Sequence, residues 1–153
     1  MPGPMYEIVG EAALLNVLRE LGALSTDEEL DALEVGANIL RDKVQDNVGA
    51  VGLNKTDTLS HSFVVERRKA LKEVAVGTPL GYRAWIHETG GTITAKRKPY
   101  LVIKHPDGGF RKVKSVYIPK RAFFRPAVEE TKDAVAQAIR RKFVETLSRK
   151  AGL

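Results

Sequence analysis

Hydrophobic residues recur at alternating steps of three and four between residues 30 and 48, which predicts a helix with one apolar face. Ser25 precedes this helix as its N-cap, and Ser25 and Glu28 are spaced for a capping box. We interpret the apolar face as core, with a subunit contact over part of it as the alternative. Its members are Leu30, Leu33, Ala37, Leu40, Val44 and Val48.

The same kind of pattern predicts a helix near each end of the chain. The first covers residues 7–21, with leucines on one face. The last begins at Pro126, a residue suited to the first helical position, and has Glu129 and Glu130 in its first turn. Basic residues and Gly152 mark its C-terminal end. Its apolar face consists of Val128, Val135, Ala138, Ile139, Phe143 and Leu147.

Between these helices the pattern favours short strands with a period of two. We expect a strand over residues 59–65 and another over 72–76, joined by a turn at 66–70. Residues 82–87 fit a short helix and a strand equally well. A short strand follows at 92–95.

A β-hairpin is the strongest signal in the second half of the chain. A strand at 100–104 is predicted to pair with one at 110–118, because His-Pro-Asp-Gly-Gly lies between them. In the second strand Lys112 and Lys114 share a face with Val116, which indicates a basic, solvent-exposed face. A proline ends that strand, since it cannot donate to the ladder.

The order of elements is two helices, five strands and one helix, without alternating βαβ units. This order predicts an α+β fold with a mainly antiparallel sheet, on which the two N-terminal helices and a long C-terminal helix pack. We expect a single domain over 1–153, with a two-helix part at 6–48, a sheet part at 58–119 and the last helix at 126–150. No apolar run has the length of a membrane span, and residues 1–7 do not resemble a signal peptide, so cytoplasmic synthesis is expected.

Charge is divided unevenly along the chain. Residues 1–65 carry a net charge of −7, residues 66–125 carry +11 and residues 126–153 carry +2. One interpretation is a chance imbalance. The other is that the basic part meets a polyanion, or that acidic and basic surfaces of neighbouring copies meet each other.

Motifs for catalysis or metal binding are weak, and we expect no enzyme and no cofactor. The chain has no cysteine. His61, His87 and His105 stand far apart, without a second ligand at metal spacing, and packing or surface roles are expected for them. Residues 49–56 end like a phosphate-binding loop, but the spacing is wrong. An enzyme with unrecognised carboxylates is the third and least favoured hypothesis.

Basic and aromatic residues are interleaved from residue 96 to residue 125, as in surfaces that bind single-stranded nucleic acid. Phe123 and Phe124 are expected to face opposite ways, one in the core and one toward a partner. The segment 96–98 and the flanking double glycine 90–91 are expected to form a loop that is mobile in the free protein and becomes ordered on assembly. The candidate interface or DNA-facing residues are Trp85, Lys96, Arg97, Lys98, Lys112, Lys114, Arg121, Phe124 and Arg125.

Six further segments matter by their order along the chain: Gly10 to Leu18, Leu33 to Val48, Thr58 to Ser62, Val74 to Thr78, Tyr82 to Ile93 and Ile118 to Ala127. In this order they resemble the tail-completion and head–tail joining (neck) proteins of tailed bacteriophages, lambdoid siphophage type. The chain departs from the family pattern at Thr58, His61 and Thr89, which stand in place of the usual glycine, arginine and aromatic residue. A related myophage family shares part of the pattern, so the phage class stays open.

The resemblance implies an α+β virion protein without catalysis or cofactor. It also implies a homo-oligomeric ring, with six copies expected, at the head–tail joint or the tail-tube end. Neighbouring neck or tail-tube proteins would be its partners, contact with DNA would be unspecific and transient, and no membrane would be involved. The competing hypothesis is a nucleic-acid-binding module that uses residues 96–121, and oligomeric state discriminates between the two.

Overall fold

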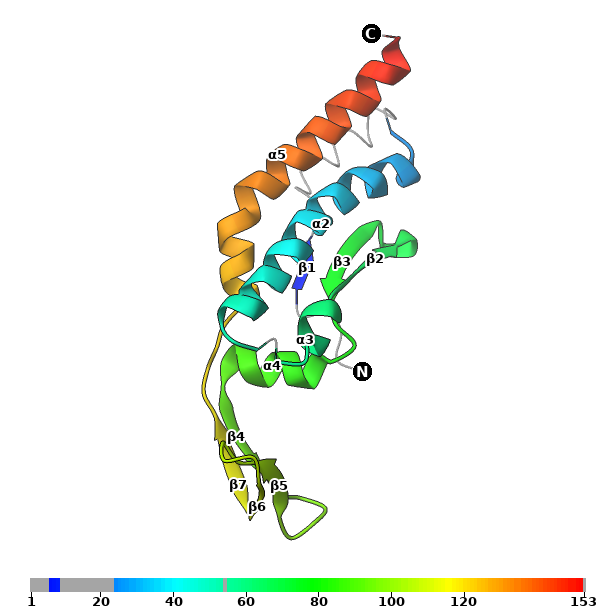
Figure 1. Ribbon diagram of the computed structural model, residues 1–153. Helices are drawn as coiled ribbons and strands as arrows, with labels where there is room; N and C mark the ends of the chain where they lie inside the picture. Colours follow the sequence, from blue (N-terminus) through cyan, green and yellow to red (C-terminus); the bar gives the residue numbers. More distant parts are fainter. Residues whose placement is uncertain (1–5, 9–23, 54, 153) are drawn as a thin grey trace.

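The computed structural model describes residues 6–8, 24–53 and 55–152, and it confirms an α+β fold with antiparallel strands and a long C-terminal helix (Figure 1). The helices are α2 (Thr26–Ala50), α3 (Thr58–His61), α4 (Gly81–Thr89) and α5 (Phe124–Ala151), with a 3₁₀ turn η1 (Lys69–Leu71). The strands are β1 (Tyr6–Ile8), β2 (Val64–Arg68), β3 (Glu73–Gly77), β4 (Gly91–Thr94), β5 (Leu101–Lys104), β6 (Phe110–Val113) and β7 (Ser115–Ile118).

Helix α2 begins as its sequence predicts. The Ser25 side chain accepts a hydrogen bond from the Glu28 N–H at 3.3 Å, and the Glu28 carboxylate accepts one from the Ser25 N–H at 2.8 Å. Each bond satisfies a backbone donor that the helix itself cannot satisfy. All six residues of the predicted apolar face are buried, so that face is core.

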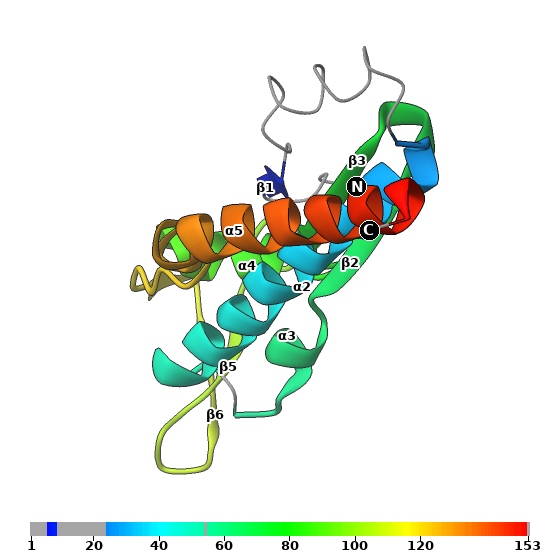
Figure 2. The ribbon, with the colours of Figure 1, turned by 90° about the horizontal axis from the view of Figure 1, so that it is seen from above.

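Helix α5 lies along α2 over much of its length (Figures 1 and 2). Gly36 of α2 allows this close approach, because a Cβ there would lie 2.8 Å from the Ile139 side chain and 2.9 Å from Val135. On another side, α2 packs against the sheet β1-β3-β2, whose central strand β3 contributes Val74 and Val76 to the core. α2 is therefore the central element of the fold.

The strand predicted at 59–65 begins too early. Residues Thr58–His61 form α3, and the chain enters β2 only at Val64. The Ser60 hydroxyl donates to the Asp57 carbonyl at 3.0 Å and the Ser62 hydroxyl to the Leu59 carbonyl at 2.7 Å. Such local bonds offer the backbone an alternative to the sheet.

The turn predicted at 66–70 is displaced. Strand β2 continues to Arg68, and the turn consists of η1 and Lys72, whose φ is 52°. Arg68 lies opposite Glu73 in the ladder, and their side chains form an ion pair at 2.9 Å. This cross-strand pair favours the longer ladder.

Two predictions at the chain ends also need correction. The helix predicted at 7–21 is wrong at its start, because Tyr6–Ile8 pairs with β3 as β1; its remaining residues lie outside the described part of the chain. The last helix begins at Phe124 rather than at Pro126, so its first turn holds no acidic residue. Its predicted C-terminal end is confirmed, with Gly152 left-handed at a φ of 74°. Among the described helices, none has both the length and the apolar character of a membrane span.

Candidate functional site

Residues 91–118 form an extension, here called the arm, that projects from the end of α4 away from the C-terminal end of α5 (Figure 1). Its inner half pairs β4 with β7, and its outer half pairs β5 with β6. Thr94 lies opposite Ser115 and Leu101 opposite Val113, so the six residues 95–100 stand opposite Lys114 alone. No residue of the arm is buried.

The predicted hairpin is confirmed, but its second strand is not continuous. β6 pairs with β5, whereas β7 pairs with β4. The break at Lys114 shifts the alternation, so Val116 is half-buried and does not share the exposed face of Lys112 and Lys114. Both lysines are exposed, as predicted.

A buried carboxylate fixes the base of the arm to the core. Glu88 of α4 accepts hydrogen bonds from the backbone N–H groups of Phe123, Phe124 and Arg125 at 2.8, 2.9 and 2.9 Å. These are the N-terminal donors of α5, which no intrahelical acceptor can satisfy, and the negative charge also suits the helix dipole. α5 therefore begins two residues before Pro126, at the point that Glu88 caps.

Gly90 makes the junction of α4 and the arm possible. Its φ is 72°, and a Cβ there would lie 2.9 Å from the backbone nitrogen of Lys120. Only glycine adopts this conformation without strain and leaves room for the returning chain. Just beyond, the Arg121 N–H donates to the His87 carbonyl at 2.7 Å. Gly90 is thus a packed junction rather than part of an open loop.

Phe124 is not an interface residue. Phe123 and Phe124 are both 0% exposed, and the Phe63 ring lies 5.8 Å and 6.0 Å from them, centroid to centroid. The prediction that the two face opposite ways assumed extended backbone, but Phe124 is the first residue of a helix. The side-chain amide of Asn47 on α2 donates a hydrogen bond to the Phe123 carbonyl at 3.1 Å, so α2 also contacts the start of α5 through a polar group.

The other candidate residues fall into three places. Trp85 lies on α4, 51% exposed, with its ring 6.4 Å from that of the exposed Tyr82. Arg121 and Arg125 are exposed beside the start of α5. The structure brings the remaining five together on the outer half of the arm, all exposed: Lys96, Arg97, Lys98, Lys112 and Lys114.

His87 is half-buried on α4, near the base of the arm. Burial, with the positive charges of Arg121 and Arg83, lowers the pKa of its ring, so the ring is neutral at pH 7. Within the described parts of the chain, no three histidine or acidic side chains are grouped as they would be around a metal ion.

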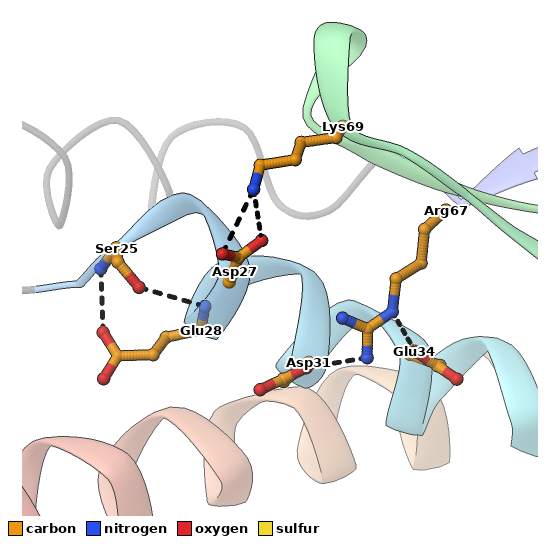
Figure 3. A network of polar contacts seen from close by, with 7 residues as sticks. All are labelled: Ser25, Asp27, Glu28, Asp31, Glu34, Arg67 and Lys69. Atoms are coloured by element: carbon orange, nitrogen blue, oxygen red, sulfur yellow. Dashed lines mark hydrogen bonds and ion pairs between the residues drawn. The ribbon is translucent and has the colours of Figure 1, made fainter.

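Three acidic residues of α2 form ion pairs with basic residues of β2 and η1 (Figure 3). Arg67 of β2 bridges Asp31, at 2.7 Å, and Glu34, and these two carboxylates raise its pKa. Lys69 pairs with Asp27 at 2.9 Å. The acidic and basic segments therefore meet here within one molecule, which the charge count alone did not predict.

Sequence reasoning also missed the role of Glu88. The available signal was its isolation, since it is the only acidic residue between 74 and 106. That isolation indicates a special environment, but its backbone partners lie 35 to 37 residues further along the chain.

Comparison with known proteins identifies a family for this chain. A family model described as "Bacteriophage HK97-gp10, putative tail-component" matches residues 12–90, just over half of the 153 residues. The match ends at the base of the arm, so the arm and α5 lie beyond it. No curated protein and no solved structure matches the chain. The chain belongs to the HK97-gp10-like family of bacteriophage tail components.

Proposed function

We propose that this protein forms a ring at the head–tail joint or at the end of the tail tube, where it connects the DNA-filled head to the tail and lets DNA pass. Membership of a phage tail-component family supports a structural role in the virion. Six copies are expected in the ring from the resemblance to neck proteins. Neighbouring neck or tail-tube proteins are its proposed partners, and catalysis is not part of the role.

The exposed aromatic surface around the base of the arm is the observation that carries this proposal. Tyr82 and Trp85 on α4, and Tyr117 on the inner half of the arm, each expose half or more of their surface. The inner half contains no charged residue. Exposed aromatic groups beside an uncharged segment are typical of protein–protein contacts.

The arm also has little to stabilise it within one subunit. Its inner and outer halves are both two-stranded, and such hairpins are marginally stable alone in water. A ring supplies a neighbour by heterologous contact, in which one patch meets a different patch on the next copy. We propose that this contact covers Tyr82, Trp85 and Tyr117.

Native mass spectrometry of the purified protein tests the ring. We expect a closed oligomer for the natural sequence, and smaller species for Trp85→Ser at the same concentration. Val144→Ser is the matched control, because Val144 is a similarly exposed apolar residue on α5. A natural protein that stays monomeric up to high concentration, or a control as damaging as Trp85→Ser, would argue against the proposed contact.

A monomeric nucleic-acid-binding module is the second candidate. The observation that favours it is the exposure of the arm cations. A monomer that binds DNA tightly at physiological salt would support the module in place of the ring.

A further inference from the structure

The net charge of the protein is concentrated in the outer half of the arm, residues 95–114. This segment has seven basic residues and one acidic residue, a net charge of +6, which equals the net charge of the whole chain. The rest of the chain therefore sums to zero. The seven are Lys96, Arg97, Lys98, Lys104, Arg111, Lys112 and Lys114.

Outside the arm, several basic residues form ion pairs with carboxylates, whereas the basic residues of the outer half mostly do not. Beyond the pairs of Arg67 and Lys69, Lys43 lies 2.7 Å from Glu130 and Lys150 lies 2.6 Å from Glu28. Within the described ranges, the only one of the seven arm cations with a carboxylate inside 4.0 Å is Arg111, which faces Asp107 at that limit. The charge of the outer half is thus not used to hold the fold together.

The strand register distributes these cations over both faces of the outer half. Lys104 lies opposite Phe110 and Lys112 opposite Val102, so both lysines share one face with two exposed apolar residues. Arg111 lies opposite Ile103 on the other face.

Two contacts place further cations in the same region. The Lys112 ammonium lies 4.4 Å from the centroid of the Tyr100 ring, at a distance typical of a cation–π contact. The loop that carries Lys96, Arg97 and Lys98 starts beside Lys114, because the Ala95 N–H donates to the Lys114 carbonyl at 2.9 Å.

We propose that the outer half of the arm binds the phosphodiester backbone of nucleic acid. Cations on both faces, of which only Arg111 lies within 4.0 Å of a carboxylate, fit a polyanion better than one flat acidic patch. A second copy of this chain is a poorer partner for this surface, because the net charge outside 95–114 is zero and Asp27, Asp31 and Glu34 of α2 already pair with basic residues of their own chain. The choice of duplex DNA as the ligand rests on the proposed position of the protein on the DNA path.

Binding of this kind is independent of base sequence and weakens steeply with salt, because each neutralised phosphate releases counterions. The DNA can then slide past the arm rather than stay bound. Exposed aromatic groups beside cations also occur on surfaces that bind single strands, so the experiment compares both forms of DNA.

Fluorescence anisotropy with a labelled random-sequence duplex, and with one of its single strands, tests the proposal over a range of salt concentrations. We expect Lys112→Ala with Lys114→Ala to weaken duplex binding and to reduce the slope of log Kd against log salt by up to about 2. The matched control is Lys132→Ala with Lys142→Ala, which removes the same charge from α5, where both lysines pair with glutamates.

Equal losses in the arm variant and the control would overturn the proposal, as would an arm variant that binds like the natural protein. Binding of the single strand alone would overturn the choice of duplex DNA. Loss of oligomerisation in the arm variant, with DNA binding unchanged, would assign the outer half to a protein partner and would also overturn it. If the protein forms a ring but does not bind duplex at low salt, this inference is refuted and the proposed ring stands. If the protein binds duplex as a monomer, the inference stands and the proposed ring is refuted.

Discussion

Aromatic and basic residues have different surroundings in the arm and in the rest of the protein. In the core, Phe123 and Phe124 are buried against Phe63, and on the surface beside α2 Arg67 pairs with two carboxylates. In the arm, Phe110 is 74% exposed and Lys112 has an aromatic ring rather than a carboxylate beside it. The difference is that these side chains have partners within the chain outside the arm, whereas the arm leaves large apolar and basic side chains exposed.

The largest contrast is expected between Phe124 and Phe110. Phe124→Ala should lower the free energy of unfolding by about 3–5 kcal/mol, because it leaves a cavity in the core. Phe110→Ala should change it by no more than about 0.5 kcal/mol, since the side chain is exposed. Urea unfolding of both variants measures this. Similar losses would mean that the arm packs as the core does.

The next largest effect is expected at Glu88. Glu88→Ala leaves three backbone N–H groups at the start of α5 without an acceptor, two of them buried, and should cost about 3 kcal/mol. Glu129→Ala is the control, because it removes an exposed carboxylate from the same end of α5. A cost for Glu88→Ala no greater than that of the control would show that the cap does not hold α4 to α5.

A smaller difference separates two glycines with positive φ, one at the base of the arm and one in its turn. Gly90→Ala meets both backbone strain and the Lys120 backbone, whereas Gly108→Ala has no atom within 4 Å of the added Cβ. We expect Gly90→Ala to destabilise the protein by about 1–3 kcal/mol more than Gly108→Ala. Thermal unfolding followed by circular dichroism compares them, and equal shifts would mean that the junction is not tightly packed.

The smallest effect concerns the network at the start of α2. The ammonium group of Lys150, followed by hydrogen bonds from Ser25, lowers the pKa of Glu28 to about 2. Glu28 therefore adds to stability above its ordinary pKa of 4.5, and this contribution is lost as pH falls from there toward 2. Lys150→Ala should raise the Glu28 pKa, as read by carboxyl NMR titration. An unchanged value would assign the shift to the capping box alone.

The sequence predicts best what depends on neighbouring residues. The start of α2, its apolar face and the end of α5 follow from local spacing, and the structure confirms all three. The start of α5 could not be predicted in this way, because the Glu88 carboxylate that caps it comes from another helix.

The candidate site could be predicted in part. Five of the nine candidate residues meet on the outer half of the arm because they are close in sequence and in register. Phe124 was misplaced because its orientation depends on a helix start that only the folded chain sets. Residues 91–94 and 115–118 are visibly uncharged in the sequence. That they form one uncharged surface follows only from the pairing of β4 with β7.

Electron microscopy of lysates from a phage that lacks this gene product tests the proposed joining role most directly. We expect heads filled with DNA and separate tails, with few joined particles, and we expect the natural gene supplied in trans to restore complete virions. Normal numbers of complete, infectious virions without the protein would contradict the account and would leave a nucleic-acid-binding module as the better explanation of the arm.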